Sequence, residues 1–267
     1  MVSLSETQRR HWMTHGWIRC SQSLAPEVAA ALSSWVEEMA VKGTKREQRL
    51  LYYERTAQGP SLCRVERFLD DHQHLRSLIV EGTLPRIAST LLGERAVIYK
   101  EKINYKQAGG AGYAPHQDAA AYRYVYHHVT CLVAIDDMAP DNGCLEFAPG
   151  HQNGLMPLNE EGCLDPNLAA TLVWTPVPVP AGDVLFFSSK APHRSGPNRT
   201  AHPRRALYLT YNAASEGNLR QAYYDDRERQ LAQRSASTTG EKTARISTIG
   251  HFLGERAHVY PGERRER

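Results

Sequence analysis

A histidine and an aspartate two positions apart, His116 and Asp118, are the residues of this sequence best suited to hold a metal ion. They stand in the stretch APHQDAAAY, among small residues and one aromatic side chain. Side chains two positions apart on an extended strand point to the same face, so both can reach one ion. An isolated His-x-Asp pair is more often the polar edge of a loop, and partners elsewhere in the chain decide between the two interpretations.

A third ligand is available in His193, which lies 75 residues after Asp118 and follows the apolar run GDVLFFSS. Two histidines and one carboxylate form a facial triad that leaves three coordination positions open, as in non-haem Fe(II) oxygenases. Ser195 stands two positions after His193, and Arg204 stands eleven positions after it. A guanidinium can bind a carboxylate through two parallel hydrogen bonds, and a hydroxyl can add a third. The spacing therefore predicts an iron site beside an anchor for a dicarboxylate cosubstrate.

The bulk composition indicates a globular protein and argues against several function classes. The chain has 267 residues, 41% hydrophobic and 23% charged, which is ordinary for a globular domain. Its net charge of +3 is too balanced for a nucleic-acid-binding face. Five cysteines without a C-x-x-C pair suggest neither a disulfide framework nor a zinc site. The sequence shows no signal-like segment and no apolar run long enough for a membrane span, so a cytoplasmic location is expected.

Helical patterns occupy the first third of the chain. Ser3 and Glu6 have the spacing of a capping box before a helix that stops at Gly16. Apolar residues then recur at helical spacing over residues 25–40. Residues 74–93 read as two helices with a break between them.

From residue 96 onward the pattern changes to short β-rich runs separated by turn residues. The expected strands are 96–106, 127–136, 144–150, 171–179, 182–189 and 205–212. At least six strands after a helical start predict a mainly β protein, an antiparallel sandwich or barrel with helices on one side. We expect one domain over residues 1–230, made of N-terminal helices (1–95) and a barrel core (96–215), followed by a polar C-terminal extension (231–267).

The sequence resembles the phytanoyl-CoA dioxygenase family of Fe(II)/2-oxoglutarate-dependent oxygenases. Four stretches carry the resemblance: HQD (116–118), DNGCLEFAPGHQNG (141–154), PAGDVLFFSSKAPHRSGPNRT (180–200) and PRRALYLTY (203–211). The family fold is a double-stranded β-helix, a cupin-like jelly-roll barrel with flanking N-terminal helices. This fold agrees with the strand pattern.

The resemblance implies roles for named residues. His116, Asp118 and His193 match the iron ligands of the family. Arg204 matches the partner of the 2-oxoglutarate C5 carboxylate, and Ser195 matches its helper. The implied cofactors are Fe(II), 2-oxoglutarate as cosubstrate, and O2.

The strand expected at 96–106 carries Lys100, Lys102, Asn104 and Lys106 on one face. Composition alone favours a solvated sheet face for such a row. Family members use the matching strand to line the active-site cavity, so the resemblance makes Lys102 and Asn104 candidate contacts of 2-oxoglutarate. It also makes Lys100 a candidate contact of an anionic substrate. Thr130 is either a hydrogen-bond donor to the cosubstrate or an ordinary sheet threonine.

The implied reaction converts 2-oxoglutarate and O2 to succinate and CO2 while an unactivated C–H bond of a small polar molecule is hydroxylated. Asp118 favours hydroxylation over halogenation, because halogenating relatives have a small residue at that position. Desaturation and ring closure stay open as outcomes.

The stretch KEKINYKQAGGAGYAPHQD resembles family members that hydroxylate small phosphonates beside the phosphorus. Lysines for an anion and tyrosines for an ammonium group suit an aminoalkylphosphonate; the tyrosines expected near the mouth are Tyr113, Tyr122, Tyr124 and Tyr126. We therefore expect a small molecule as partner, with an anion favoured, and neither nucleic acid nor a membrane. The sequence gives no indication of the oligomeric state.

Three alternatives differ from this hypothesis. Within the family, a natural-product tailoring oxygenase shares much of the same framework. A non-catalytic jelly-roll binding protein shares the strand pattern, but it does not require His116, Asp118, His193 and Arg204 together. A nucleic-acid demethylase on the same barrel predicts a basic face, and the charge balance argues against it.

Overall fold

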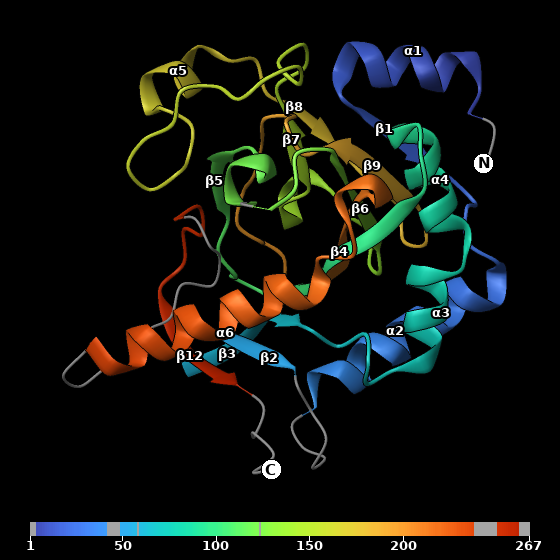
Figure 1. Ribbon diagram of the computed structural model, residues 1–267. Helices are drawn as coiled ribbons and strands as arrows, with labels where there is room; N and C mark the ends of the chain where they lie inside the picture. The colour runs from blue at the N-terminus through green and yellow to red at the C-terminus, as the bar shows by residue number, and fades with distance from the viewer. Residues whose placement is uncertain (1–3, 42–48, 58, 123, 238–249, 262–267) are drawn as a thin grey trace.

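Two antiparallel β-sheets form the centre of the molecule (Figure 1), and the computed structural model describes residues 4–41, 49–57, 59–122, 124–237 and 250–261. Among these residues the larger sheet has eight strands in the order β1-β9-β6-β11-β4-β3-β2-β12, and the smaller has four in the order β5-β10-β7-β8. The strands are β1 (Trp17–Cys20), β2 (Leu50–Thr56), β3 (Gly59–Glu66), β4 (Ala96–Lys106), β5 (Tyr113–His116), β6 (His128–Ala134), β7 (Leu145–Phe147), β8 (Thr175–Val177), β9 (Val184–Ser188), β10 (His193–Ser195), β11 (Arg204–Ala213) and β12 (Arg256–Pro261).

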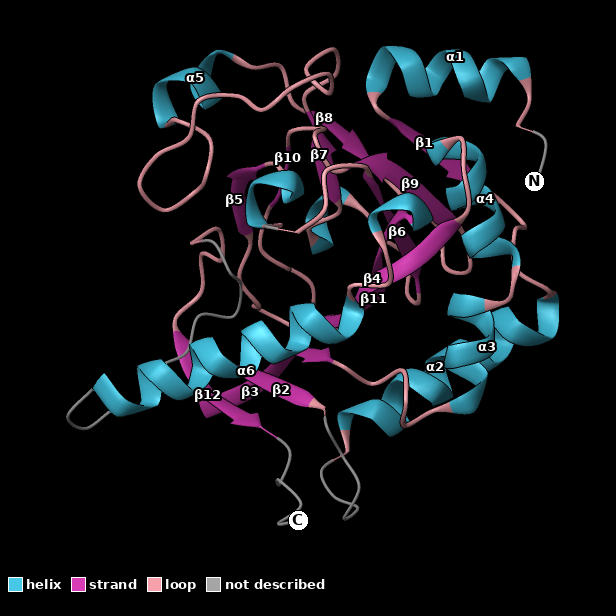
Figure 2. Ribbon diagram, in the orientation of Figure 1, coloured by secondary structure: helices cyan, strands magenta, loops and turns pink. Residues whose placement is uncertain are grey.

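The strands from β4 to β11 distribute between the two sheets as in a jelly roll. Along the chain, β4, β6, β9 and β11 enter the larger sheet, whereas β5, β7, β8 and β10 enter the smaller one. Figure 2 shows β5, β10 and β7 close together in the smaller sheet. This arrangement confirms the double-stranded β-helix predicted from the sequence.

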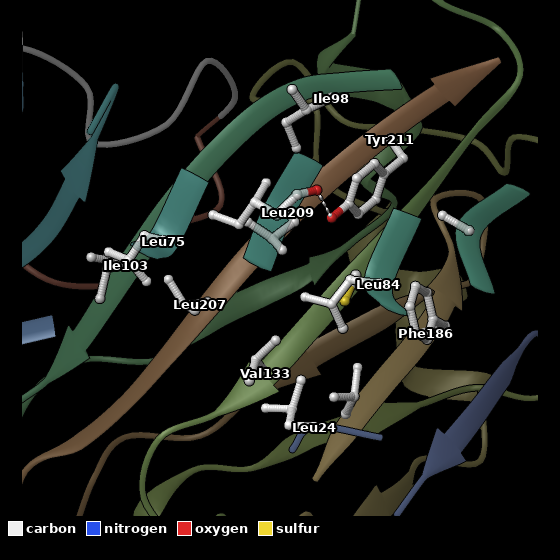
Figure 3. Close-up of a cluster of buried hydrophobic side chains, with 14 of the residues drawn as sticks. Leu24, Leu75, Leu84, Ile98, Ile103, Val133, Phe186, Leu207, Leu209 and Tyr211 are labelled. Atoms are coloured by element: carbon white, nitrogen blue, oxygen red, sulfur yellow. Dashed lines mark hydrogen bonds between the residues drawn. The ribbon is translucent and has the colours of Figure 1, made fainter. Parts of the chain in front are cut away.

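Three of the described helices, at residues 26–40, 73–80 and 83–92, cover the outer face of the larger sheet. The helices in the described part of the chain are α1 (Glu6–His15), α2 (Pro26–Ala40), α3 (Gln73–Val80), α4 (Thr83–Leu92), α5 (Pro166–Thr171) and α6 (Arg220–Ser237). Leu75 of α3 and Leu84 of α4 join one apolar cluster with Ile103, Val133 and Leu207 of the sheet (Figure 3). Full burial of such a side chain contributes roughly 1.5–3 kcal/mol, so this layer holds the helices against the barrel.

Successive side chains of a strand point to opposite faces of the sheet, and this alternation determines which residues lie between the two sheets. On β6, Val133 packs outward under the helices, whereas Leu132 joins a second apolar cluster with Phe147 and Phe187 between the sheets. Thr130 has the same parity as Leu132, so it also faces the interior. The barrel interior is thus apolar around Leu132 and polar around Thr130, where the site residues gather.

The predicted strands are all present, but the prediction is incomplete. The N-terminal region 1–95 contains β1 and the β2–β3 hairpin in addition to the expected helices. The short strands β5 and β10 also lack the β-rich composition that signals a strand. Within the described residues, no helix is long and apolar enough to cross a membrane.

The first helix is capped by different residues from those predicted. The Ser5 side chain accepts from the Gln8 backbone N–H at 3.1 Å, and the Gln8 side chain accepts from the Ser5 N–H at 2.9 Å. This reciprocal pair is a capping box that begins two residues later than the Ser3–Glu6 spacing suggested. Ser3 lies outside the described residues, and the helix ends before Gly16 as expected.

The end of the chain returns to the barrel. β12 pairs with β2 at one edge of the larger sheet, and β1 pairs with β9 at the other edge. His251 and Phe252, which precede β12, are buried. The division into a domain ending near residue 230 and an extension remains a prediction, although residues 250–261 contact the barrel.

Tyr211 ties the sheet to the helical layer, and its removal should destabilise the protein. Its buried hydroxyl donates to the Ile79 carbonyl at 2.8 Å (Figure 3), in the last turn of α3 where carbonyls lack intrahelical partners. We expect Tyr211→Phe to lower the free energy of unfolding by about 1–2 kcal/mol in urea titrations. Tyr126→Phe, at a highly exposed position, is the control. Equal stability of the two variants would contradict the prediction.

Candidate active site

The short strands β5 and β10 bring two distant histidines together. They pair antiparallel, and the register places His116 directly opposite His193. Opposed residues in such a pair have Cβ atoms about 4.5–5.5 Å apart, and the two imidazole centroids lie 4.2 Å apart here. Both side chains are buried.

Backbone carbonyls fix the orientation of both imidazoles. Nδ1 of His116 lies 2.7 Å from the carbonyl oxygen of Ala114, and Nδ1 of His193 lies 3.0 Å from that of Ala191. A carbonyl only accepts hydrogen bonds, so each Nδ1 carries the hydrogen and each Nε2 keeps its lone pair. Burial and the neighbouring His193 lower the pKa of His116 to about 3, and burial also lowers the pKa of His193. Both rings are therefore neutral and can bind a metal through Nε2.

Asp118 opens a 3-10 turn, η1, whereas β5 ends at His116. Strand alternation therefore explains only part of why the two side chains meet. Oδ1 of Asp118 lies 3.8 Å from Nε2 of His116, and the Thr130 hydroxyl donates to Oδ2 at 3.0 Å. Burial alone would raise the pKa of Asp118, but His193 and Lys102 outweigh burial and hold this pKa well below its usual value. The carboxylate is ionised and oriented.

Gln117, between the two ligand candidates, anchors the segment from the opposite side. Its fully buried side chain donates to the carbonyls of Gly154 and Lys190, at 2.8 and 2.5 Å. It also accepts from the backbone N–H of Met156 at 2.8 Å. These three bonds hold the turn in place and keep Gln117 out of the metal site.

His116, Asp118 and His193 form one group suited to a metal ion. Their ligand atoms all lie within 4.8 Å of one another. Two neutral imidazoles and one carboxylate are the donor set of non-haem Fe(II) centres and leave coordination positions free for other ligands. The residues therefore fit the iron predicted from the sequence.

Arg204 and Ser195 lie with Lys106 at a second polar position. Arg204, at the start of β11, is buried opposite Lys106 and donates through Nη2 to the Gly143 carbonyl at 2.6 Å. Its Nε has no hydrogen-bond partner among the described residues. The Lys106 ammonium donates to Ser195 Oγ at 3.0 Å. A buried guanidinium with an unused donor, near an ammonium and a hydroxyl, fits a carboxylate of the cosubstrate.

The polar row on β4 faces the interior, so the solvated-face interpretation of this row is wrong. Every residue from Lys100 to Lys106 is buried. The Lys102 ammonium lies 5.0 Å from the centroid of the Tyr208 ring, and burial, with Arg64 nearby, lowers its pKa to about 7. Asn104 accepts through Oδ1 from Nε of Arg64 at 3.0 Å and borders the same pocket as Arg204.

Sequence reasoning missed a set of buried charges beside this row. Glu66 Oε1 lies 3.3 Å from Nη1 of Arg64 and 3.5 Å from the ammonium of Lys100. Arg227 of α6 also influences the Glu66 carboxylate and donates to the Tyr52 hydroxyl at 3.1 Å. We call the four basic members the interior cation cluster: Arg64, Lys100, Lys102 and Arg227. The alternation Arg64-x-Glu66 in the stretch LCRVERF was an available signal of a polar strand face.

The four predicted tyrosines separate into two groups. Tyr113 receives a hydrogen bond from Nη2 of Arg64 at 3.2 Å, and the Tyr122 hydroxyl lies 2.8 Å from Thr210 Oγ1. Both therefore border the interior. Tyr124 and Tyr126 are exposed.

Comparison with known families identifies the group to which this arrangement belongs. Residues 12–206 match the model of the phytanoyl-CoA dioxygenase family (PhyH). The span includes the His-Asp-His group and Arg204. The chain belongs to the phytanoyl-CoA dioxygenase family.

Two relatives match over nearly the whole chain. The methylphosphonate hydroxylase of Gimesia maris is 46% identical over 257 residues, which cover 96% of this chain and 98% of the relative. The 2-aminoethylphosphonate dioxygenase of an uncultured bacterium is 32% identical over 246 residues, covering 90% and 94%. Among solved structures, EctD from S. alaskensis with 2-oxoglutarate and 5-hydroxyectoine has a TM-score of 0.67 at 20% identity, covering 80% of this chain and 77% of that chain. The similarity to EctD supports the assignment of the fold.

Family membership and these relatives establish the class of activity. The protein is an enzyme, a non-haem Fe(II)/2-oxoglutarate-dependent dioxygenase that uses O2 and acts on a small molecule. The alternative of a non-catalytic jelly-roll binding protein is thereby excluded.

The depressed pKa of Lys102 predicts a pH-dependent stability of the protein without metal and cosubstrate. Below pH 7 the folded and unfolded states both bind the proton, and the full cost of burying the charge is present. As the pH rises from about 7 toward the unfolded value near 10.4, only the unfolded state binds the proton, so the cost falls.

We therefore expect Lys102→Met to be more stable than the natural sequence at pH 6.5. This advantage should shrink by up to ~1.4 kcal/mol per pH unit between about pH 7 and 9, measured by urea unfolding. Lys190→Met, at a partly exposed position, is the matched control. A constant difference across this range would contradict the prediction.

Proposed function

We propose that this enzyme hydroxylates a short-chain phosphonate at the carbon bonded to phosphorus. In this proposal His116, Asp118 and His193 hold Fe(II), while Arg204 and Ser195 hold the distal carboxylate of 2-oxoglutarate. The substrate assignment depends on the interior cation cluster. This cluster lies near the His-Asp-His group, and its basic residues are more numerous than the one carboxylate, Asp118, of that group.

Hydrogen bonds orient the predicted metal ligands in the absence of an ion. The Ala114 and Ala191 carbonyls keep the lone pair of each imidazole on Nε2, and Thr130 orients the ionised Asp118 carboxylate. The bound iron would supply the oxidising chemistry that splits 2-oxoglutarate with O2 into succinate and CO2 and hydroxylates the substrate. Phe147 and Phe187 pack against the His193 ring and keep water from that side of the centre.

The cosubstrate is expected to extend from the metal group toward Arg204. Asn104 borders the pocket with Arg204. Lys102 lies two positions before Asn104 on β4, and its charge lowers the pKa of Asp118. Both positions support the predicted roles of Lys102 and Asn104 as cosubstrate contacts. Thr130 already donates to Asp118, so its role is to orient that carboxylate.

Charge balance favours a doubly charged substrate. With Lys102 assigned to the cosubstrate, the basic residues Arg64, Lys100 and Arg227 all act on the buried Glu66 carboxylate. Burying unbalanced charge is costly, and burial lowers the pKa of Lys100 to about 8 even with Glu66 beside it. A phosphonate dianion offsets more of this positive charge than a simple carboxylate does.

Two members of the phosphonate class have specific support. Methylphosphonate is the substrate named for the 46% identical relative. The predicted aminoalkylphosphonate is supported by the 32% identical relative and by Oε2 of Glu66, which is buried and has no hydrogen-bond partner among the described residues. This oxygen is an available acceptor for an ammonium group.

We also infer a reducing compartment, the cytoplasm, as the location of the enzyme. All five cysteines are buried, and none of them forms a disulfide. Burial raises the pKa of several of their thiols, including Cys63 and Cys131, which keeps these thiols protonated and unreactive. Free thiols in the core are typical of proteins that do not form disulfides.

The proposed function is tested in two stages on one preparation. Anaerobic addition of Fe(II) and 2-oxoglutarate to the apo-protein should produce the weak visible charge-transfer band of the chelate, and His193→Ala should abolish it. Succinate release in air is then measured with methylphosphonate, 2-aminoethylphosphonate and the carboxylates acetate and β-alanine as matched anionic controls. We expect phosphonate-dependent succinate release and an α-hydroxylated product, with little response to the carboxylates.

Each stage can overturn a different part of the proposal. A band that persists in His193→Ala would show that the ligand assignment is wrong. A normal band with no phosphonate hydroxylation would leave the metal site intact and reject the substrate, pointing to a natural-product tailoring role. Loss of 2-aminoethylphosphonate turnover alone in Glu66→Gln would place the ammonium group on that carboxylate.

Arg204 and its neighbour Arg205 provide a matched pair for the cosubstrate assignment. Arg205 pairs with Asp136 and Glu37 outside the barrel. We expect Arg204→Ala to raise the KM for 2-oxoglutarate at least ~30-fold, the equivalent of roughly 2 kcal/mol for one partner of a buried charge pair. Excess 2-oxoglutarate should partly restore turnover. Arg205→Ala should leave this KM unchanged; equal effects of the two changes would reject the assignment.

A further inference from the structure

A short segment near the end of the chain forms one side of the metal centre. We call residues 250–254 the C-terminal strap; in Figure 1 it lies beside β5. The Ala114 N–H donates to the His251 carbonyl at 2.7 Å, and the Leu253 N–H donates to the Gly112 carbonyl at 3.1 Å. Tyr113 and Phe252 form an antiparallel bridge between these bonds. The strap is therefore joined by backbone hydrogen bonds to the strand that carries His116.

The strap is closely packed where it leaves β5. Gly254 has no room for a side chain, since a Cβ there would lie 2.5 Å from the Phe252 ring and 2.7 Å from Ala111 Cβ. Phe252 in turn borders the pocket that Arg204 lines. The strap thus closes the cosubstrate end of the site as well as flanking the metal group.

His251 lies directly against a ligand candidate. Its ring stacks on that of His116, with centroids 3.9 Å apart and planes inclined by 21°. It is buried, and its Nδ1 has no hydrogen-bond partner among the described residues. The ring therefore contributes contact area at this position and makes no polar anchor through Nδ1.

We propose that His251 is a positioning residue that holds the His116 imidazole in its metal-binding orientation. The Nδ1–carbonyl bond to Ala114 restrains one edge of the His116 ring, and turning the ring about its Cβ–Cγ bond would move Nε2 away from Asp118 and His193. The His251 face blocks this rotation. Ala114 also bonds to the His251 backbone, so one residue of β5 restrains the ligand ring and the strap together.

The inference rests on the proposed role of His116 as an iron ligand, yet it adds a part of the chain outside the family match. The match ends at residue 206, 45 residues before His251. The C-terminal strap therefore places His251, which lies outside the residues that match the family model, against the metal group. Its effect is predicted on metal affinity, independent of which substrate the enzyme uses.

The test compares anaerobic Fe(II) affinity, measured by competition with a chromogenic chelator, across full-length variants. We expect His251→Ala to weaken Fe(II) binding about tenfold, as is common when a group that orients a metal ligand is removed. His251→Phe keeps a flat ring and should stay within about threefold of the natural sequence. Leu253→Ala, at an exposed position in the same strap, is the control.

The outcomes separate this inference from the proposed ligand set. Unchanged affinity in His251→Ala overturns the inference, and so does a His251→Phe variant as weak as the alanine one. Melting temperatures of the metal-free proteins show whether His251→Ala has a folding defect. If it has one, the Fe(II) affinity of His251→Phe decides whether the inference holds. If His116→Ala binds Fe(II) as well as the natural sequence does, the ligand assignment itself fails.

Discussion

The register between β5 and β10 is the constraint on which the active site depends. It sets His116 opposite His193, and a slip of one strand by one residue would place the two rings on opposite faces of the small sheet. The carbonyls two residues before each histidine then select the tautomer that leaves Nε2 for the metal. Gln117 and Thr130 act on the same segment, one as an anchor and the other as a donor to Asp118. The geometry of the centre is therefore set by strand pairing and by these side-chain hydrogen bonds, without a bound ion.

Charge is the second constraint. The interior of most barrels of this size is filled by apolar side chains, but here β3, β4 and α6 direct cations into it. Glu66 compensates only part of this charge, and the lysines respond with lowered pKa values. Under the proposed function, anionic ligands complete the balance, and the protein without them is the less stable form. Affinity for anions thus follows from the cost of burying the basic residues without them.

The sequence predicted the barrel because its strand signals were local, and the three residues predicted as metal ligands lie together in the structure. Long β-rich runs such as 96–106 and the His-x-Asp spacing are visible without any structure. The two strands that carry the histidines have the sequences YAPH and HRS, which are too short and too polar to show a strand pattern. Their pairing depends on the tertiary structure and cannot be recognised from local sequence. An extra residue on β4, Tyr99, lies opposite the step from Thr210 to Tyr211 on β11. This bulge places Ile98 under the helices while Lys100 stays inside. Arg227 and His251 reach the interior from beyond the barrel strands, and no spacing rule relates them to His116.

The origin of the charged residues has an evolutionary consequence. Arg64 and Glu66 come from the β2–β3 hairpin and Arg227 comes from α6, whereas the metal group stands on the barrel strands and the turn after β5. Under the proposed function, changes in the hairpin or in α6 alter which small molecule is accepted while the metal group stays intact. Substrate specificity and oxidation then reside in separate elements, so specificity can diverge by substitution in the hairpin and α6 alone.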